Sequence, residues 1–352
     1  MNQYQEAAAV PLRWVGPIAL SGNAITGEVD VPLATYESPL WPSVARGAKV
    51  SRLCERGIVA TVVDERMTRS VLLQAPDAGA ALAAVRWLTE GRAELEAVVA
   101  ARSRFARLLE IRHQIVGDLL FLRFEFATGD ASGHNMATLA SDALLDYILT
   151  ALAQLRYGSV SGNFCTDKKA TAVNGILGRG KNVVAEIVIP AHVVGSTLHT
   201  TAAAVAELNV RKNLIGTTLA GGIRSANAHY ANMLLAVYLA TGQDAANIVE
   251  GSQGITHAED RDGALYFSCT LPNIIVGTIG NGKNLDFADA NLIRLGCRAT
   301  AEPGANARRL AAIIAATVLC GELSLMAAQT NPGELMRSHI RFERSMEEVV
   351  GQ

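Results

Sequence analysis

The stretch between about residues 71 and 160 constrains the fold most, because strands and helices follow each other within it as a self-contained unit. Its apolar residues recur in part with helical spacing and in part with the alternation of a strand. The predicted elements are a strand at 71–73, helices at 77–89 and 95–113, a half-buried strand at 120–126 and a helix at 133–157. We therefore expect an α+β unit inserted into a larger fold.

The residues on either side of this stretch supply the larger fold. The chain has 352 residues, more than one typical domain, and 50% of them are hydrophobic. Residues 58–63 are typical of a short buried strand, and residues 305–328 predict a long apolar helix. Because Gly321 and Glu322 interrupt its apolar run, this helix is too short to span a bilayer, and we expect no membrane segment.

Charge, cysteine content and histidine spacing argue against several classes of function. The formal net charge of -2 leaves no extended basic face for nucleic acid. The five cysteines include no CxxC pair, and residues 1–6 lack the blocks of a secretory signal, so we expect a cytoplasmic protein. The histidines show no HExxH or similar spacing, and we predict no metal site.

The most telling chemical motif is the segment from Ser161 to Lys169, in which Asp167 is followed by Lys168 and Lys169. Two adjacent ammonium groups in a small, polar segment can hold a carboxylate or an oxygen that becomes anionic in a transition state. Asp167 can keep them protonated if the site is partly dry. In isolation such a segment is more often a solvated turn, so its interpretation depends on the rest of the chain.

Two glycine-containing loops are candidates for binding phosphate groups. Residues 128–135 lie where a strand ends and a long helix begins, which is where backbone N–H groups and the helix dipole receive anions. They fit neither GxGxxG nor the Walker sequence, and the alternative is an ordinary helix cap by Asp130 or Ser132. Residues 276–284 are a strand leading into a second glycine-rich loop, for which a tight turn is the alternative.

Three further residues are informative only in combination. Glu37 lies in an extended segment that could present a carboxylate to a cleft, Asp244 follows an apolar helix, and His339 lies near a polar C-terminus. Taken alone, each is more often a solvated surface residue.

Together, these segments resemble the family of hydroxymethylglutaryl-coenzyme A reductases, specifically the soluble catalytic region of its class I type. The resemblance covers about residues 11–345 and rests on motifs that recur in family order. They are Ala34-Thr35 with Glu37, Met67-Thr68-Arg69, Gly129-Asp130-Ala131, Ser161 to Lys169 with Asn174, Gly178-Arg179-Gly180-Lys181, Lys212-Asn213-Leu214, Asn227-Ala228-His229 with Asn232, Gly242-Gln243-Asp244, Gly277-Thr278, Gly321 to Ala328, and Ser338-His339.

The resemblance implies a four-electron reduction of a thioester to a primary alcohol, which releases coenzyme A and mevalonate. Lys168 matches the lysine that stabilises the oxyanion formed by hydride addition. Glu37 matches a proton-donating glutamate, whose pKa must be raised by burial or by a neighbouring carboxylate, for which Asp244 is the candidate. His339 matches the histidine that protonates the leaving thiolate.

The resemblance also implies the binding residues. Contacts to the hydroxymethylglutaryl-CoA thioester match Arg46, Arg69, Ser161, Asp167, Lys169, Lys212 and Asn232. Contacts to the cofactor match Arg104, Asp130, Ala131, Ser132, Gly133, His134, Asn135, Gly280, Asn281 and Gly282. Arg104, matching a residue near the cofactor phosphates, favours NADPH, with NADH also possible.

The fold and assembly implied by the family complete the prediction. Residues 1–70 and 161–352 form a large mixed substrate-binding domain, and residues 71–160 a small inserted ferredoxin-like α+β domain that binds NAD(P). The active site is shared between subunits of a homodimer or a dimer of dimers. The alternatives are an enzyme that oxidises mevalonate, a reductase of a related acyl thioester, and an inactive binding or regulatory homologue.

Overall fold

A computed structural model describes residues 8–337 and residue 340 of the chain. The strands are β1 Leu12–Gly22, β2 Gly27–Ala34, β3 Ile58–Gln74, β4 Arg107–Val116, β5 Leu119–Ala127, β6 Arg156–Ser159, β7 Gly180–Ile189, β8 Ser225–Ala226, β9 Gly254–Arg261 and β10 Ala264–Ile274. The α-helices are α1 Leu40–Arg52, α2 Ala78–Glu90, α3 Arg92–Arg102, α4 His134–Ala151, α5 Ala172–Leu177, α6 Ala191–Val193, α7 Ala202–Leu208, α8 Thr217–Leu219, α9 Tyr230–Ala240, α10 Ile248–Gly251, α11 Asp286–Arg294 and α12 Ala305–Gln329. Two π-helical turns, η1 Val194–Leu198 and η2 Asn209–Gly216, and one 3₁₀ turn, η3 Ala245–Asn247, complete the order.

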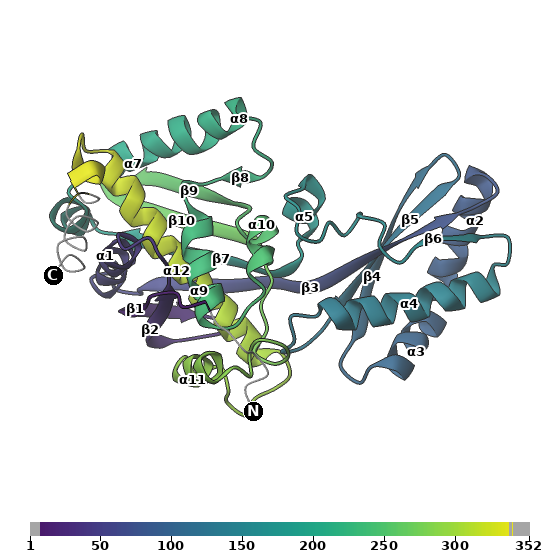
Figure 1. The fold of residues 1–352 in the computed structure, drawn as a ribbon. Coiled ribbons are helices and arrows are strands. Elements are labelled where there is room, and N and C mark those ends of the chain that lie inside the picture. The colour runs from purple at the N-terminus through teal and green to yellow at the C-terminus, as the bar shows by residue number, and fades with distance from the viewer. Residues whose placement is uncertain (1–7, 338–339, 341–352) are drawn as a thin grey trace.

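A large mixed sheet runs in the order β2-β1-β3-β7-β10-β9-β8. Its centre is antiparallel, with Ile189 of β7 opposite Leu265 of β10. Side chains of β7 alternate between the two faces of the sheet, and Val183, Ala185 and Ile187 are buried in the main core. Helices α1, α9 and α12 pack against this sheet (Figure 1).

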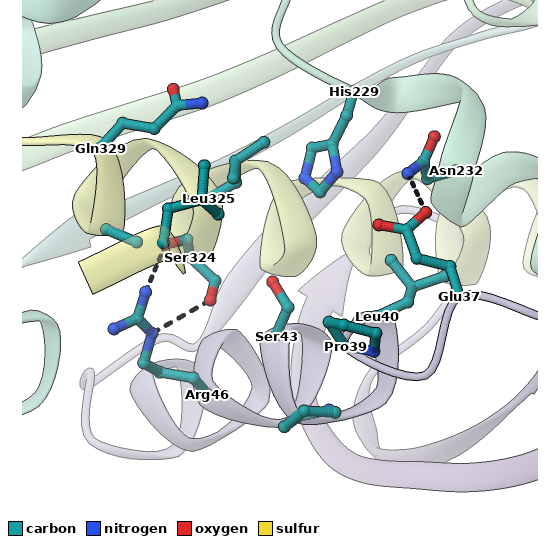
Figure 2. A pocket seen from close by; sticks show the side chains of 13 residues that line it. Glu37, Pro39, Leu40, Ser43, Arg46, His229, Asn232, Ser324, Leu325 and Gln329 are labelled. Carbon is teal, nitrogen blue, oxygen red and sulfur yellow. Dashed lines mark hydrogen bonds between the residues drawn. The ribbon is translucent and has the colours of Figure 1, made fainter. Parts of the chain in front are cut away.

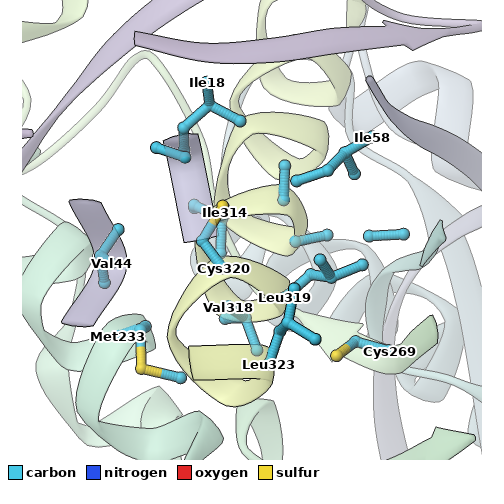
Figure 3. Packing of buried hydrophobic residues seen from close by; sticks show 14 of the residues in the cluster. Ile18, Val44, Ile58, Met233, Cys269, Ile314, Val318, Leu319, Cys320 and Leu323 are labelled. Carbon is cyan, nitrogen blue, oxygen red and sulfur yellow. The ribbon is translucent and has the colours of Figure 1, made fainter. Parts of the chain in front are cut away.

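Helix α12 forms the centre of the main core, and the predicted helix at 305–328 is confirmed. Figure 3 shows its side chains packed between β1, α1, α9 and β10. A Cβ on Gly47 of α1 would overlap the backbone of Cys320, so only glycine permits the two helices to pack this closely. By length and composition α12 could cross a membrane, but 94% of its most apolar window is buried inside the protein, as expected of a core helix.

A second, antiparallel sheet has the order β6-β3-β5-β4. Helices α2, α3 and α4 cover one of its faces (Figure 1), and it has a hydrophobic cluster of its own. With α2 and α3 together as the first crossover and α4 as the second, this is the strand order of a ferredoxin-like fold. The predicted α+β fold class is therefore confirmed.

One strand joins the two sheets. Residues 58–63 and 71–73 are not separate strands, because β3 runs unbroken through 17 residues. Its first part, as far as Arg66, pairs with β7, and its second part, from Met67, pairs with β5. The small sheet is thus attached to the large one by continuous backbone.

Two helix predictions extend too far. The predicted helix at 95–113 ends at Arg102, because the Ser103 hydroxyl accepts hydrogen bonds from the N–H groups of Phe105 and Ala106 and turns the chain into β4. The predicted helix at 133–157 ends at Ala151, and residues 156–159 add an edge strand to β3. In both places pairing with distant strands outweighs local helical spacing.

The predicted half-buried strand at 120–126 is β5, but it is buried on both faces. Arg123 and Glu125 lie on the face that a half-buried strand would turn to solvent, yet both are 0% exposed. They pair with each other at 3.0 Å between Nε and Oε1. Arg66 and Arg112 also pair with Glu125, so the carboxylate is compensated although it is removed from water.

Candidate active site

The segment that carries the adjacent lysines is a strained loop. Asn163, Thr166 and Lys168 all have positive φ angles, of 59°, 46° and 55°, a region that non-glycine residues rarely adopt. Arg123 of β5 contacts this loop: it donates to the carbonyl of Phe164 at 3.2 Å and to the side chain of Asn174 at 2.9 Å. Asn174 in turn donates to the carbonyl of Thr166. Such strain persists only where surrounding contacts fix the backbone, and it is common at functional sites.

Lys168 forms an ion pair with Asp244, with 2.8 Å between Nζ and Oδ2. The hydrogen bond that the Lys168 ammonium donates to the Asp244 carboxylate is the main reason that the pKa of Lys168 lies above its ordinary value. Burial acts to raise the pKa of Asp244, but the Lys168 ammonium and the N–H of Ala246 together lower it. The pair therefore stays a cation and an anion, with both side chains partly open to solvent at 42% and 47% exposure.

The position of Asp244 is fixed by its neighbour in sequence. The side chain of Gln243 donates to the carbonyl of Gly277 at 3.0 Å and accepts from its N–H at 3.1 Å. This two-way contact ties the turn after α9 to the segment that follows β10. Gly242 and Gly282 touch so closely that a Cβ on either one would overlap the other's backbone. The predicted cofactor loop at Gly280–Gly282 thus lies against the Asp244 turn.

Asp167 lies in a charged cluster with Arg179 and His134. Its Oδ1 is 2.9 Å from the Arg179 guanidinium and 3.6 Å from Nε2 of His134. Burial, followed by the Arg179 charge, lowers the pKa of His134 to about 4, so its imidazole is neutral at neutral pH. Arg179 also pairs with Glu250, whose carboxylate accepts the backbone N–H of Lys168.

The remaining predicted substrate contacts of this region lie around the same loop. Arg69 of β3 donates to Thr138 of α4 at 3.0 Å and lies 3.5 Å from the Ser161 hydroxyl. Lys169 is exposed, and its ammonium donates to the backbone carbonyl of Asp167. We call Arg69, Ser161, Asp167, Lys168, Lys169, His134 and Asp244 the lysine cluster.

Glu37 lies in a different place, at a pocket of about 420 Å³ formed by α1, α9 and α12. Figure 2 shows the Asn232 side chain donating to the Glu37 carboxylate, at 2.6 Å, with His229 beside them. Arg46 lines the same pocket and is fixed by Glu334 at 2.8 Å and by the Ser324 hydroxyl at 3.0 Å. We call Glu37, Arg46, His229 and Asn232 the glutamate cluster.

A buried carboxylate supports the glutamate cluster. Glu322 of α12 is 0% exposed and accepts hydrogen bonds from the N–H groups of Ala228 and His229. These bonds set the start of α9, while the His229 ring contacts the carbonyl of Gly321 at 2.9 Å. Burial lowers the pKa of Lys212, and the charge of Glu322 partly opposes this. Lys212 therefore lies within electrostatic range of Glu322.

Helix α9 separates the two clusters within one chain. Asn232 lies in its first turn, whereas Asp244 follows its last residue, Ala240. The helix spans about 12 Å between Asn232 and Ala240. Within the described part of one chain, Glu37 binds Asn232 and Asp244 binds Lys168, so the neighbourhood of Glu37 and Asp244 stays a prediction for a site shared between two copies.

The two predicted cofactor loops meet in space. The N–H of Thr278 donates to the carbonyl of Asp130 at 2.8 Å, and Ala131 bridges Ile279. The Asp130 carboxylate accepts from the N–H groups of Gly304 and Ala307, so it caps α12. The expected alternative, a cap of the following helix by Asp130 or Ser132, is wrong, since Gly133 is the N-cap of α4 with a φ of 97°.

The other predicted cofactor residues surround these loops. Ser132, His134 and Asn135 lie at the N-terminus of the 18-residue helix α4, where N–H groups and the helix dipole favour an anion. Arg104 is exposed beyond the end of α3, with its guanidinium 5.6 Å from the Phe105 ring. Among the described residues, no group of three or more His, Cys, Asp or Glu side chains is arranged to hold a metal ion.

Several residues in or next to the two clusters were not assigned a role from sequence. Arg179 belongs to the motif Gly178-Arg179-Gly180-Lys181, and the glycines on both sides of it are the only local sign of a functional role. His229 also belongs to a motif, whereas Glu250 and Glu322 carry no local pattern that separates them from surface glutamates. His339, the predicted thiolate-protonating residue, lies outside the described residues.

Comparisons with known proteins agree with the motifs. The sequence profile of the hydroxymethylglutaryl-coenzyme A reductase family matches residues 6–344. The chain is 44% identical over 323 residues to the 3-hydroxy-3-methylglutaryl-coenzyme A reductase of Pyrococcus abyssi, covering 91% of this chain and 78% of that protein. It is 41% identical over 343 residues to the reductase of Strongylocentrotus purpuratus, covering 96% of this chain and 36% of that protein. The fold is shared with the class II reductase of Streptococcus pneumoniae bound to NADPH, with a TM-score of 0.74, 19% sequence identity, and coverage of 94% and 88% of the two chains.

Proposed function

Because this chain belongs to the hydroxymethylglutaryl-coenzyme A reductase family, its reaction is the reduction of hydroxymethylglutaryl-CoA to mevalonate, and we propose that the lysine and glutamate clusters together perform it. The observation that carries this proposal is the ion pair that Lys168, which lies on a strained loop, forms with Asp244. An ammonium held in place before the reaction stabilises an oxyanion without reorganisation.

The charge states of the two clusters divide the chemical roles. Lys168 stays protonated and stabilises the oxygen of the thioester carbonyl as it becomes anionic. Asp244 stays ionised, so it orients Lys168 rather than donating a proton. Glu37, held by Asn232 at the rim of the pocket, is the proposed proton donor for aldehyde reduction. His339 is the proposed acid for the leaving thiolate.

The active site is proposed to form between two copies of the chain. The separation of the clusters by α9 supports this arrangement, because one copy's lysine cluster needs the glutamate cluster of another to complete the catalytic set. An exposed apolar surface near Lys212 is available for such contact. Its residues are Val210, Leu214, Ile215, Leu219 and Ile223. Light scattering tests the assembly, and an active enzyme with the mass of a monomer would contradict it.

NADPH is the proposed reductant, and when bound it supplies the hydride. The N-terminus of α4 and the glycine loop around Asn281 fit a dinucleotide, because backbone N–H groups and small residues allow phosphates to approach closely. Arg104, exposed near the end of α3, is the proposed partner of the 2′-phosphate. Arg104→Ala is expected to raise the KM for NADPH and leave that for NADH unchanged.

The assigned domains and location are part of the same proposal. Residues 71–160 form the cofactor-binding domain, which the separate hydrophobic cluster of the second sheet supports. A cytoplasmic location is favoured by the cysteines, all five of which are unpaired and buried.

The decisive experiment mixes the purified protein with hydroxymethylglutaryl-CoA and NADPH, and follows both cofactor absorbance and free thiol. Two NADPH oxidised for each thiol released is the expected result for a four-electron reduction. A folded oligomer that oxidises neither NADPH nor NADH would contradict the proposal.

A further inference from the structure

A buried ion pair lies directly beneath the lysine loop. The guanidinium of Arg179 and Oε1 of Glu250 are 2.8 Å apart. The Arg179 side chain is 2% exposed and that of Glu250 is 0% exposed, so both charges are removed from water. Taking two charges out of water costs about as much as their attraction returns, so a buried pair of this kind is weak evidence for a stabilising role.

Each member of the pair contacts a different functional residue. Oε1 of Glu250 accepts the backbone N–H of Lys168 at 3.1 Å, and the second guanidinium nitrogen of Arg179 contacts Oδ1 of Asp167 at 2.9 Å. Lys168 adopts a positive φ that is unfavourable for a side chain of its size. The bond from its N–H to Glu250 is therefore one of the contacts that can hold this backbone conformation.

The pair is itself rigidly fixed by two asparagines. Asn273, at the end of β10, accepts the N–H of Arg179 at 2.8 Å and donates to the carbonyl of Glu250 at 3.2 Å. Asn247 donates to Oε1 of Glu250 at 3.0 Å. Because Asn247 follows Asp244 by three residues in the same turn, the network also reaches the partner of Lys168.

We propose that Arg179 and Glu250 are positioning residues, which hold the backbone of Lys168 and the carboxylate of Asp167 in the geometry that oxyanion stabilisation requires. This inference rests on the proposed function, because it assigns the pair a role in the same reaction. A displacement of about 1 Å at a reacting group can cost on the order of 10²-fold in rate. The pair acts through Lys168 and does not touch substrate.

The test replaces Glu250 by glutamine, which keeps the shape and an acceptor for the Lys168 N–H but removes the charge that fixes Arg179. The expected result is a fall in kcat of roughly 10- to 100-fold, with the directly measured Kd for NADPH unchanged. The matched control is Glu259→Gln, an exposed glutamate paired with Arg261 on β9, for which kcat should not change. Arg179→Lys is the second variant. Two guanidinium nitrogens of Arg179 contact Glu250 and Asp167, and the single ammonium of a lysine cannot replace both contacts.

A double-mutant cycle separates positioning from general damage to the fold. In the Lys168→Ala background there is no ammonium left to position, so adding Glu250→Gln should lower the residual single-turnover rate by less than about threefold. An equal fall in both backgrounds, or no fall in the wild-type background, would overturn the inference. If Glu250→Gln gives no folded protein, Arg179→Lys decides by the same cycle. An inactive wild-type enzyme would instead overturn the proposed function, so the two failures are distinguishable.

Discussion

Replacing Arg123 by methionine is expected to destabilise the protein strongly, although the side chain lies on a strand of the small sheet. Its guanidinium is 0% exposed and donates to Glu125, to Asn174 and to the carbonyls of Phe164 and Gly178. Methionine has a similar length but provides no donor. The substitution therefore leaves a buried carboxylate less compensated and three acceptors without this partner.

The size of the effect follows from these contacts. Removing one member of a buried ion pair costs about 3–5 kcal/mol. Arg66 and Arg112 still contact Glu125, which favours the lower end, but each neutral acceptor that loses its donor adds about 1 kcal/mol. We expect a total loss of about 6 kcal/mol in the free energy of unfolding, about 3 kcal/mol from the ion pair and about 1 kcal/mol from each of the three acceptors.

The assay is urea unfolding at one fixed protein concentration, since subunit assembly makes the midpoint depend on concentration. The matched control is Arg112→Met, because Arg112 contacts the same carboxylate at 3.3 Å but is 39% exposed. The control should lose less than about 1 kcal/mol. If Arg123→Met is no more destabilising than Arg112→Met, the argument that the buried guanidinium of Arg123 holds the lysine loop is wrong.

Three further predictions concern single residues. Lys168→Ala should reduce both reductive steps to a residual rate that only single-turnover measurement detects, while leaving the affinity for NADPH largely intact in a fluorescence titration; substantial steady-state turnover would refute the oxyanion role. His134 binds fewer protons in the folded than in the unfolded protein between pH 6.5 and about 4. Its contribution to the free energy of unfolding is therefore complete above pH 6.5 and is lost as the pH falls through this window. His134→Gln should therefore reduce the fall in Tm between pH 7 and about 5, and an unchanged fall would contradict this assignment. Gly47→Ala should cost about 2 kcal/mol or more in thermal unfolding, because its Cβ would overlap Cys320, whereas Gly195→Ala, which enters open space, should cost less.

The elements that could be predicted from sequence are those whose pattern is local. Helix α12 is apolar over most of its length, and the strand around Phe124 has an apolar residue at every second position; the structure contains both. The end of α3 could not be placed, because it depends on the Ser103 hydroxyl and on the pairing of β4 with β5. The two-residue spacing of Arg123 and Glu125 predicts that both side chains share one face of the strand, but not that this face is buried.

The site was predictable in its chemistry but not in its arrangement. The adjacent charges of Asp167, Lys168 and Lys169 indicate an anion site from sequence alone, whereas the backbone conformation of Lys168 depends on Glu250, 82 positions later. Likewise, the contact of Glu37 with Asn232 joins residues 195 positions apart. No local pattern reports such distances, and none shows that α9 keeps the two clusters apart.

The claim that one active site is built from two copies is tested most directly by mixing two inactive variants. Glu37→Gln leaves the lysine cluster intact, and Lys168→Ala leaves the glutamate cluster intact. If the chains pair at random, half of the dimers are hybrids with one complete site of two, so about a quarter of the wild-type activity should return. No recovery of activity in hybrids verified by differently tagged chains would contradict the shared site.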